Sequence, residues 1–133
     1  MPERYLFSTE IPVRITDLNY GRHLGNDALL SIIHEARVRF LSHFNYTESN
    51  IEGVGSMMAD VAIIYKHQGY YGDRLTIRIG IDDVSRKSCD FYYNITNQAD
   101  KVVALCKTTI VFYNDQLQKP VNIPAGFLAK IRM

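Results

Sequence analysis

The sequence predicts an α+β fold in which a curved antiparallel β-sheet wraps around one long central helix. The helix is predicted by residues 27–44, which contain neither proline nor glycine and place apolar side chains around more than half of the helical circumference. The sheet is predicted by one strand-like segment before this stretch and four after it, joined mostly by short turns. A helix this apolar must be enclosed on most sides, so the strands must supply a curved cover.

The first strand is predicted by Ile11, Val13 and Ile15, which alternate with Pro12 and polar residues. Pro12 indicates an edge of the sheet or the start of the strand. If the alternation continues, Asp17 points to the same side as the aliphatic residues, where burial raises the pKa of its carboxyl unless hydrogen bonds lower it. The alternative is that Asp17 caps a turn or binds loop N–H groups, since aspartate is common where strands end.

The long helix is expected to begin after a loop at residues 17–26 that contains Gly21 and Gly25. Glycine allows backbone conformations that other residues resist, and Asn26 is a favourable N-cap residue. Asp27 places a negative charge in the first turn, where the helix dipole stabilises it. The backbone N–H groups at such an end lack partners, so we expect them to attract a developing negative charge on an oxygen atom.

Four further strands and a short helix are expected after the central helix. Residues 57–66 form a mostly apolar run, which is typical of a strand covered on both faces. Asp60 interrupts this run and is interpreted as a solvent-facing or hydrogen-bonded residue, with a second active carboxylate as the alternative. The remaining predicted elements are strands at residues 75–82, 89–95 and 102–113, and a tail helix at residues 125–131.

Length and composition predict one soluble domain spanning residues 1–133. The net charge of +1 without a basic cluster gives no reason to expect a nucleic-acid partner. We expect a cytoplasmic protein without membrane association, because no signal-peptide pattern and no apolar run of membrane-spanning length is present. Cys89 and Cys106 lie in apolar strand-like runs, which favours core thiols in a reducing compartment over a disulfide.

The predicted sheet has edges that need partners. Long strands such as residues 102–113 expose unpaired N–H and C=O groups when they lie at an edge. A single sheet would also leave part of the central helix uncovered. We therefore expect a homodimer or a homotetramer, with sheets joined edge to edge or packed face to face.

Three sequence motifs carry a family resemblance: Val13–Asp17, then Asp17–Asn26, then His34–Leu41. Weaker matches follow at Tyr65, at Tyr71-Gly-Asp73, and at Lys119-Pro120 with Pro124. Together they resemble the hotdog-fold acyl-CoA thioesterases of the 4-hydroxybenzoyl-CoA thioesterase type. The pattern of that family before the helix looks like Asp-x-Asp-x-x-Gly-His-x-Asn-Asn, and the likeness runs from about residue 11 to 125.

The resemblance implies hydrolysis of a coenzyme A or acyl carrier protein thioester at a dimer interface, with the helix N-terminus polarising the carbonyl. Asp17, His23 and Asn26 match polar residues of the family motif and are the predicted catalytic residues. The sequence departs from the pattern at Asn19, which takes the second acidic position, and in the Gly-His pair, which is shifted by one residue. Either Asp17 has taken over the acidic role, or the chemistry is altered or lost.

Thioester hydrolysis needs donors for the carbonyl oxygen and an activated water or a nucleophile. Asp17 would attack the carbonyl or act as a base, while His23 would orient water or assist the leaving thiolate. Asn26 would hold water or substrate through its amide. No cofactor is implied beyond the coenzyme A of the substrate, and the histidines show no metal-ligand spacing, so no metal is expected. The predicted substrate-binding residues are Asn19, Gly25 and Asp27.

Each of these assignments has a structural alternative. The alternative for Asn26 is that it is an N-cap without a catalytic role, and the alternative for His23 is that it is a structural residue of the loop. Arg37 is interpreted as a snorkelling or carboxylate-paired arginine rather than a substrate ligand. Lys66 and His67 are interpreted as a solvated strand end rather than a site for coenzyme A phosphates. The functional alternatives are a non-catalytic protein that binds acyl thioesters or lipids, and a hotdog hydratase or dehydratase.

Overall fold

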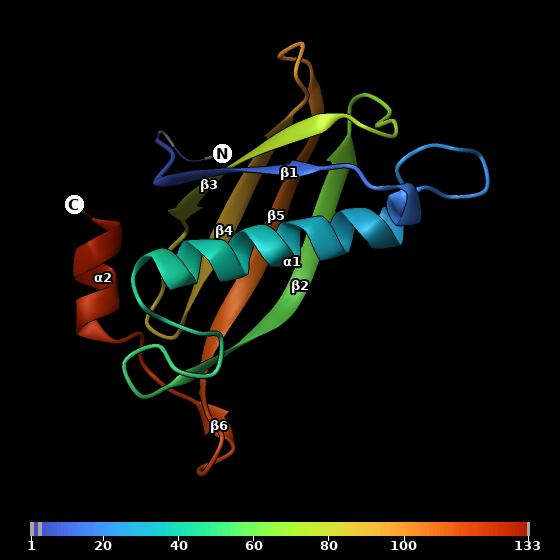
Figure 1. Ribbon diagram of the computed structural model, residues 1–133. Helices are drawn as coiled ribbons and strands as arrows, with labels where there is room; N and C mark the ends of the chain where they lie inside the picture. Colours follow the sequence, from blue (N-terminus) through green and yellow to red (C-terminus); the bar gives the residue numbers. More distant parts are fainter. Residues whose placement is uncertain (1, 3, 133) are drawn as a thin grey trace.

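The computed structural model describes residues 2 and 4–132 and shows an antiparallel sheet with a long helix packed across one face (Figure 1). The predicted α+β fold, with a curved sheet around one central helix, is confirmed. In chain order the elements are β1 (Phe7–Pro12), the 3₁₀ helix η1 (Ile15–Asp17), α1 (Asn26–His43), β2 (Gly55–Tyr65), β3 (Arg74–Asp82), β4 (Ser88–Thr96), β5 (Val102–Asn114), β6 (Lys119–Pro120) and α2 (Ala125–Ile131).

Helix α1 is held against the sheet by a buried apolar surface. Leu29, Ile33 and Phe40 on this surface are almost fully buried. The Phe40 ring lies edge-on to Phe91 of β4 and to Phe7 of β1, with ring centroids 5.6 and 5.8 Å apart. Such aromatic pairs contribute about 0.5–1.5 kcal/mol beyond the burial of their area. The helix is therefore fixed across several strands at once, as its apolar circumference predicts.

The strands are ordered β1-β3-β4-β5-β2, with β6 paired to β5, and all the pairs are antiparallel. Short turns join β3, β4 and β5, as expected. Strands that follow one another in the sequence were expected to be neighbours in the sheet. This is wrong for β2 and β3, because β2 pairs with β5 instead. The segment 66–73 therefore leads the chain from β2, at one edge of the sheet, toward the β1–β3 side.

Strand β2 forms an edge of the sheet, so the expectation that it is covered on both faces is wrong for this chain. Met58 is 46% exposed and Ile64 is 58% exposed. Asp60 lies beside a register irregularity and pairs with Lys107, whose Nζ lies 3.1 Å from its Oδ1. The interpretation of Asp60 as a solvent-facing, hydrogen-bonded residue is confirmed. The apolar side chains along this edge remain without a cover among residues 2 and 4–132.

The first strand lies earlier in the chain than the alternation predicts. β1 ends at Pro12, and residues 15–17 form the 3₁₀ helix η1. Ile15 is 65% exposed, so the alternating pattern does not continue to Asp17 on the core side. The physical reason is that Pro12 has no N–H for a ladder bond, and the N–H of Arg14 donates to the Asp17 carboxylate, which closes a turn.

The remaining elements follow the expected pattern. The tail helix α2 is confirmed and buries Phe127 against Phe112 of β5, with ring centroids 5.3 Å apart. Cys89 and Cys106 are free and buried, and burial raises the pKa of each thiol to about 12. In the part of the chain that the structure describes, no helix combines the length and apolar character needed to cross a membrane.

Candidate active site

Asn19 organises the loop that precedes α1. Its side-chain Oδ1 accepts hydrogen bonds from the N–H of Gly21 at 2.9 Å and of His23 at 3.2 Å. Its backbone carbonyl accepts the N–H of Arg22 at 2.9 Å, and Arg22 adopts a left-handed conformation with φ of 66°. An asparagine side chain suits this folded loop. Because an amide cannot take up a proton at neutral pH, Asn19 can position the loop and a ligand but cannot act as a base.

The N-terminus of α1 is open. Gly25 is the N-cap, so the expectation that Asn26 takes this place is wrong by one residue. The N–H of Gly25 donates to the carbonyl of Asp17 at 3.0 Å, so Gly25 does not offer its N–H to a substrate. No side chain caps this end, and the N–H groups of Asn26, Asp27 and Ala28 have no partner among residues 2 and 4–132. The backbone N–H groups that are expected to bind an oxyanion therefore begin at Asn26.

The Asp27 side chain folds back over the N-cap. A Cβ atom added at Gly25 would lie 2.8 Å from Asp27 Oδ1, so the absence of a side chain at Gly25 makes room for this carboxylate. Asp27 remains solvent-exposed at the first turn, where a negative charge is stabilised by the helix dipole. This arrangement places one carboxylate beside the helix mouth without a capping bond to the free N–H groups.

Asp17 is 4% exposed, and its carboxylate is bound by Arg14. Its Oδ2 accepts the Arg14 backbone N–H at 2.8 Å and Nε–H at 3.3 Å, and its Oδ1 accepts Nη2–H at 3.2 Å. Burial raises the pKa of Asp17, but the hydrogen bonds and the charge of Arg14 outweigh it and hold the pKa below its ordinary value. The turn-capping alternative is thus confirmed, whereas a strand carboxylate with a raised pKa is not observed.

A cavity of about 380 Å³ lies beside the open end of α1. It brings together three predicted site residues, namely Asn19, His23 and Asn26. Asp17, Gly25 and Asp27 are close to this cavity in the chain but are not among its lining residues. The opposite wall comes from the end of β2, the turn that follows it and β5, through Tyr65, Lys66, His67, Gln68, Gly69 and Val103.

His23 is the ionisable side chain that the loop brings to this cavity. It is half-buried, and its ring lies edge-on to Tyr70 with the centroids 5.4 Å apart. The N–H of the next residue, Leu24, donates to the carbonyl of Gly69 at 2.8 Å, which joins the loop to the turn after β2. A neutral imidazole nitrogen can accept a proton from water, so this position suits a general base.

Lys66 and His67 are closer to the site than the sequence suggested. Their N–H groups donate to the carbonyl of Val103 at 2.9 and 3.2 Å, which fixes the end of β2 beside the cavity. Both side chains are exposed, as expected for a solvated strand end, yet both residues line the cavity. No local pattern reveals this proximity, because it depends on the long-range pairing of β2 with β5.

Among the described residues, no group of three or more His, Cys, Asp or Glu side chains is arranged to hold a metal ion. The cavity offers backbone N–H donors, two imidazoles, three side-chain amides and a lysine. This donor set can bind a carbonyl oxygen and a water molecule, and it can stabilise negative charge as it develops.

The family model of the thioesterase-like superfamily matches residues 13–131 of the sequence. The chain belongs to this superfamily. Its membership supports thioester hydrolysis as the class of activity. No curated protein was found to match the sequence.

Solved structures support the fold of this superfamily member. A 1,4-dihydroxy-2-naphthoyl-CoA thioesterase from Synechocystis aligns with a TM-score of 0.86 and 21% identity over 95% of each chain. A DHNA-CoA thioesterase from Staphylococcus aureus aligns with a TM-score of 0.82 and 17% identity, over 94% of this chain and 87% of its own. YbaW of Escherichia coli, described as a probable thioesterase, aligns with a TM-score of 0.81 and 24% identity, over 93% of this chain and 95% of its own. At these identities the likeness shows the hotdog fold, which confirms the predicted architecture.

The paired Asp17 carboxylate makes a prediction about stability. Because its pKa is lowered in the folded protein, its charge stabilises the fold at neutral pH, and this contribution is lost as the pH falls through the lowered pKa. Asp17→Asn should therefore lower the free energy of unfolding by roughly 1 kcal/mol at pH 7. The gap between wild type and variant should close in acid, as measured by urea unfolding from pH 7 to pH 3.

Glu10→Gln is a suitable control, because Glu10 is exposed and lies 4.0 Å from its partner Arg74. We expect it to change stability little at any pH. A gap for Asp17→Asn that stays constant down to pH 3 would show that the carboxylate charge does not hold the turn.

Proposed function

We propose that this protein hydrolyses an acyl thioester of coenzyme A or acyl carrier protein to a free acid and a thiol, as enzymes of the 4-hydroxybenzoyl-CoA thioesterase type do. The observation that carries the proposal is the meeting of His23 and Asn26 in one cavity at an uncapped helix N-terminus. Thioesterase-like superfamily membership supports the same reaction class. Neighbouring structures include thioesterases for 1,4-dihydroxy-2-naphthoyl-CoA and gentisyl-CoA, which favours coenzyme A as the carrier.

In this proposal the thioester carbonyl points at the first turn of α1. The N–H groups of Asn26 and Asp27 stabilise the oxyanion that forms when water attacks the carbonyl carbon. One such donor is typically worth about 3 kcal/mol in the transition state. Gly25 and Asn19 shape the mouth, because the N–H of Gly25 and the side chain of Asn19 hold the surrounding loop.

His23 is the proposed general base, and the Asn26 amide holds the attacking water. His23 lines the cavity, whereas the Asp17 carboxylate does not and is bound by Arg14. Asp17 is the second candidate, as base or nucleophile. Its backbone carbonyl accepts the N–H of Gly25, so the residue lies next to the helix mouth. The Arg14 side chain is 68% exposed, so its release into solvent would free Asp17 Oδ1, while Oδ2 would keep the bond from the Arg14 backbone N–H.

The proposed leaving group is the thiol of coenzyme A or of the phosphopantetheine arm. In this proposal Lys66 and His67, which line the cavity, bind its phosphate groups. No cofactor takes part. A cytoplasmic location, where coenzyme A esters occur, completes the proposal.

We further propose that the protein forms a homodimer through β2, with a homotetramer as a higher assembly. β2 leaves a row of backbone groups and apolar side chains unpaired at the sheet edge within the described chain. Pairing with a second copy would cover Met58 and Ile64 and bring a partner surface close to the cavity at Tyr65 and Lys66.

Two other functions fit the fold less well. A hydratase or dehydratase needs a paired histidine and carboxylate beside the thioester. At the helix mouth His23 has no such partner, because the Asp17 carboxylate is held by Arg14, and the His34–Glu48 pair lies in a different cavity. A non-catalytic acyl-thioester or lipid-binding protein is favoured by Asn19, which stands where the family has an acid. Turnover of coenzyme A esters in a thiol-release assay separates that alternative from the proposal.

His23→Ala is predicted to lower kcat for acyl-CoA hydrolysis by about 100-fold or more, the range expected for losing a general base. Asp17→Asn should keep activity within about threefold while losing stability. Release of free coenzyme A across acyl chain lengths and aryl thioesters measures both. If His23→Ala keeps near-normal activity and Asp17→Asn loses activity, the role of general base belongs to Asp17 instead. His43→Ala, at the other end of α1, is the matched control.

The solution mass tests the proposed dimer. We expect light scattering to give twice the chain mass of 15.3 kDa, or four times that mass for a tetramer. Ile64→Lys, on the exposed edge strand, should shift the protein toward monomer and lower its activity. A wild-type monomer at micromolar concentration with full activity would contradict the proposed assembly.

A further inference from the structure

The His23 imidazole is held by packing rather than by a hydrogen bond. Among residues 2 and 4–132, no hydrogen bond engages either ring nitrogen, and the aromatic contact of this ring is with Tyr70. Both nitrogens are therefore free for water in the cavity. A general base must lie within hydrogen-bond reach of the proton that it takes, so the residues that fix the orientation of this ring bear on the proposed reaction.

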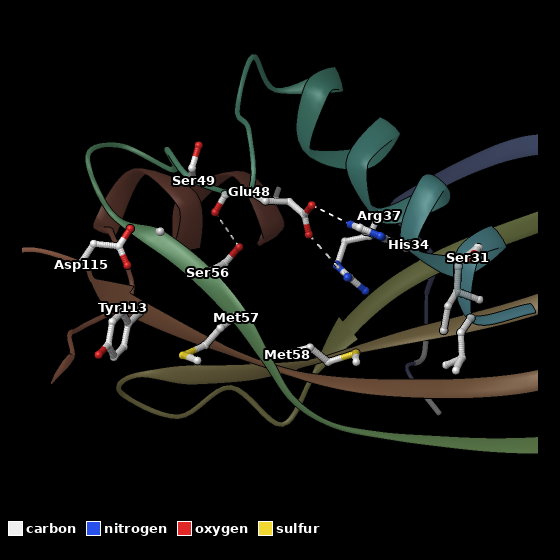
Figure 2. Close-up of a pocket in the computed structure, with 13 residues that line it drawn as sticks. Ser31, His34, Arg37, Glu48, Ser49, Ser56, Met57, Met58, Tyr113 and Asp115 are labelled. Atoms are coloured by element: carbon white, nitrogen blue, oxygen red, sulfur yellow. Dashed lines mark hydrogen bonds and ion pairs between the residues drawn. The ribbon is translucent and has the colours of Figure 1, made fainter. Parts of the chain in front are cut away.

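A histidine elsewhere on α1 shows the other way to fix an imidazole. His34 lies in a larger cavity of about 660 Å³ between α1 and the start of β2, where its Nε2 lies 2.7 Å from Glu48 Oε1 (Figure 2). The second oxygen of Glu48 accepts Arg37 Nη2–H at 3.5 Å, which confirms the sequence-based interpretation of a carboxylate-paired arginine. A carboxylate thus orients His34 directly. His23 has no such partner, so its orientation depends on the turn that carries Tyr70.

The turn at residues 69–73 meets the His23 loop at three points. The carbonyl of Gly69 accepts the N–H of Leu24 at 2.8 Å, and the ring centroids of Tyr70 and His23 lie 5.4 Å apart. The Gly69 backbone also packs closely on Leu24, because a Cβ atom added at Gly69 would lie 2.9 Å from Leu24 Cβ. The position of the loop therefore follows the position of this turn.

Asp73 fixes the turn in its own place. Asp73 is 8% exposed; its Oδ2 accepts the N–H of Tyr70 at 2.9 Å, and its backbone N–H donates to the carbonyl of Tyr70 at 3.1 Å. Its Oδ1 accepts Nε2–H of Gln98, in the hairpin between β4 and β5, at 2.9 Å. One residue thus binds both backbone polar groups of Tyr70 and anchors them to the sheet.

This arrangement requires two acceptor oxygens at position 73. An asparagine offers one, so either the Tyr70 N–H or the Gln98 amide would lose its acceptor in Asp73→Asn. Gln98 cannot compensate by rotating its amide, because its Oε1 already accepts the N–H of Arg74 at 2.9 Å. Neither Tyr70 nor Asp73 lines the cavity, so any effect of these residues on the reaction passes through their neighbours.

We propose that Tyr70 and Asp73 are positioning residues for His23. Asp73 fixes the backbone of Tyr70, and the Tyr70 ring holds the imidazole in the orientation in which it serves as the base. The proposal rests on the function proposed above, in which His23 takes the proton from water.

Tyr70→Leu removes the ring at a position that is 46% exposed, so the variant should fold. With octanoyl-CoA and benzoyl-CoA as probes, kcat should fall at least about tenfold, because a misplacement of 1 Å can cost about 100-fold. KM should change less than about twofold, since the cavity wall is intact. Tyr70→Phe should restore kcat, because the Tyr70 hydroxyl has no hydrogen-bond partner among the described residues.

Tyr71→Leu is the matched control. Tyr71 is the next residue, is 64% exposed, and makes no aromatic contact within the described chain, so kcat should stay near that of the wild type. Asp73→Asn should act like Tyr70→Leu, which keeps the test valid if Asp73→Asn does not fold. Equal kcat in Tyr70→Leu and Tyr71→Leu would overturn the proposal.

A double variant shows whether the effect passes through His23. In the His23→Ala background, Tyr70→Leu should lower kcat by no more than about twofold, because residues that act as a unit are not additive. A full tenfold loss in that background would contradict positioning through His23.

NMR spectroscopy keeps the two proposals apart, since it needs no turnover. The imidazole C–H signals of His23, identified by their absence in His23→Ala, should move in Asp73→Asn and stay in place in Tyr71→Leu and Tyr70→Phe. Signals that do not move in Asp73→Asn would overturn the role of Asp73. A wild-type protein without turnover, or with full activity in His23→Ala, would overturn the proposed reaction, while movement of the signals would still support the fixing of His23 by this turn.

Discussion

Two backbone hydrogen bonds at the start of α1 hold the candidate active site together. The N–H of Gly25 donates to the carbonyl of Asp17 at 3.0 Å, and the N–H of Leu24 donates to the carbonyl of Gly69 at 2.8 Å. They join the 3₁₀ helix, the start of the long helix and the turn after β2, three segments that lie far apart in the sequence. The cavity beside Asn26 depends on this junction.

The helix mouth stays open because neither nearby acid caps the first turn. Arg14 binds the Asp17 carboxylate, and the Asp27 side chain lies against Gly25. An acid that capped the first turn would occupy the N–H groups that the proposed reaction requires for the oxyanion. The ion pair between Asp17 and Arg14 therefore stabilises the loop, and in the proposed reaction it also neutralises a negative charge near the oxyanion of the transition state.

Local periodicity predicted most of the fold, because the buried face of α1 and the alternation in β3 both follow local rules. It failed where a single interaction decides the backbone. Asp17 capping Arg14 ended the first strand early, and Gly25 displaced Asn26 from the N-cap. Within the site, motif spacing predicted that His23 and Asn26 lie together, but the approach of Lys66 depends on the long-range pairing of β2 with β5, which no local pattern encodes.

The central claim is that free N–H groups of the first turn of α1 bind the thioester oxygen. Asn26→Pro removes one of them at the first helical position, where proline is tolerated, and Gly25 with ψ of 158° already suits a residue before proline. Asn26→Ala removes the side chain alone. The account predicts that kcat for acyl-CoA hydrolysis falls about 100-fold further in the proline variant than in the alanine variant, at similar thermal stability. Equal activity of the two variants would contradict it.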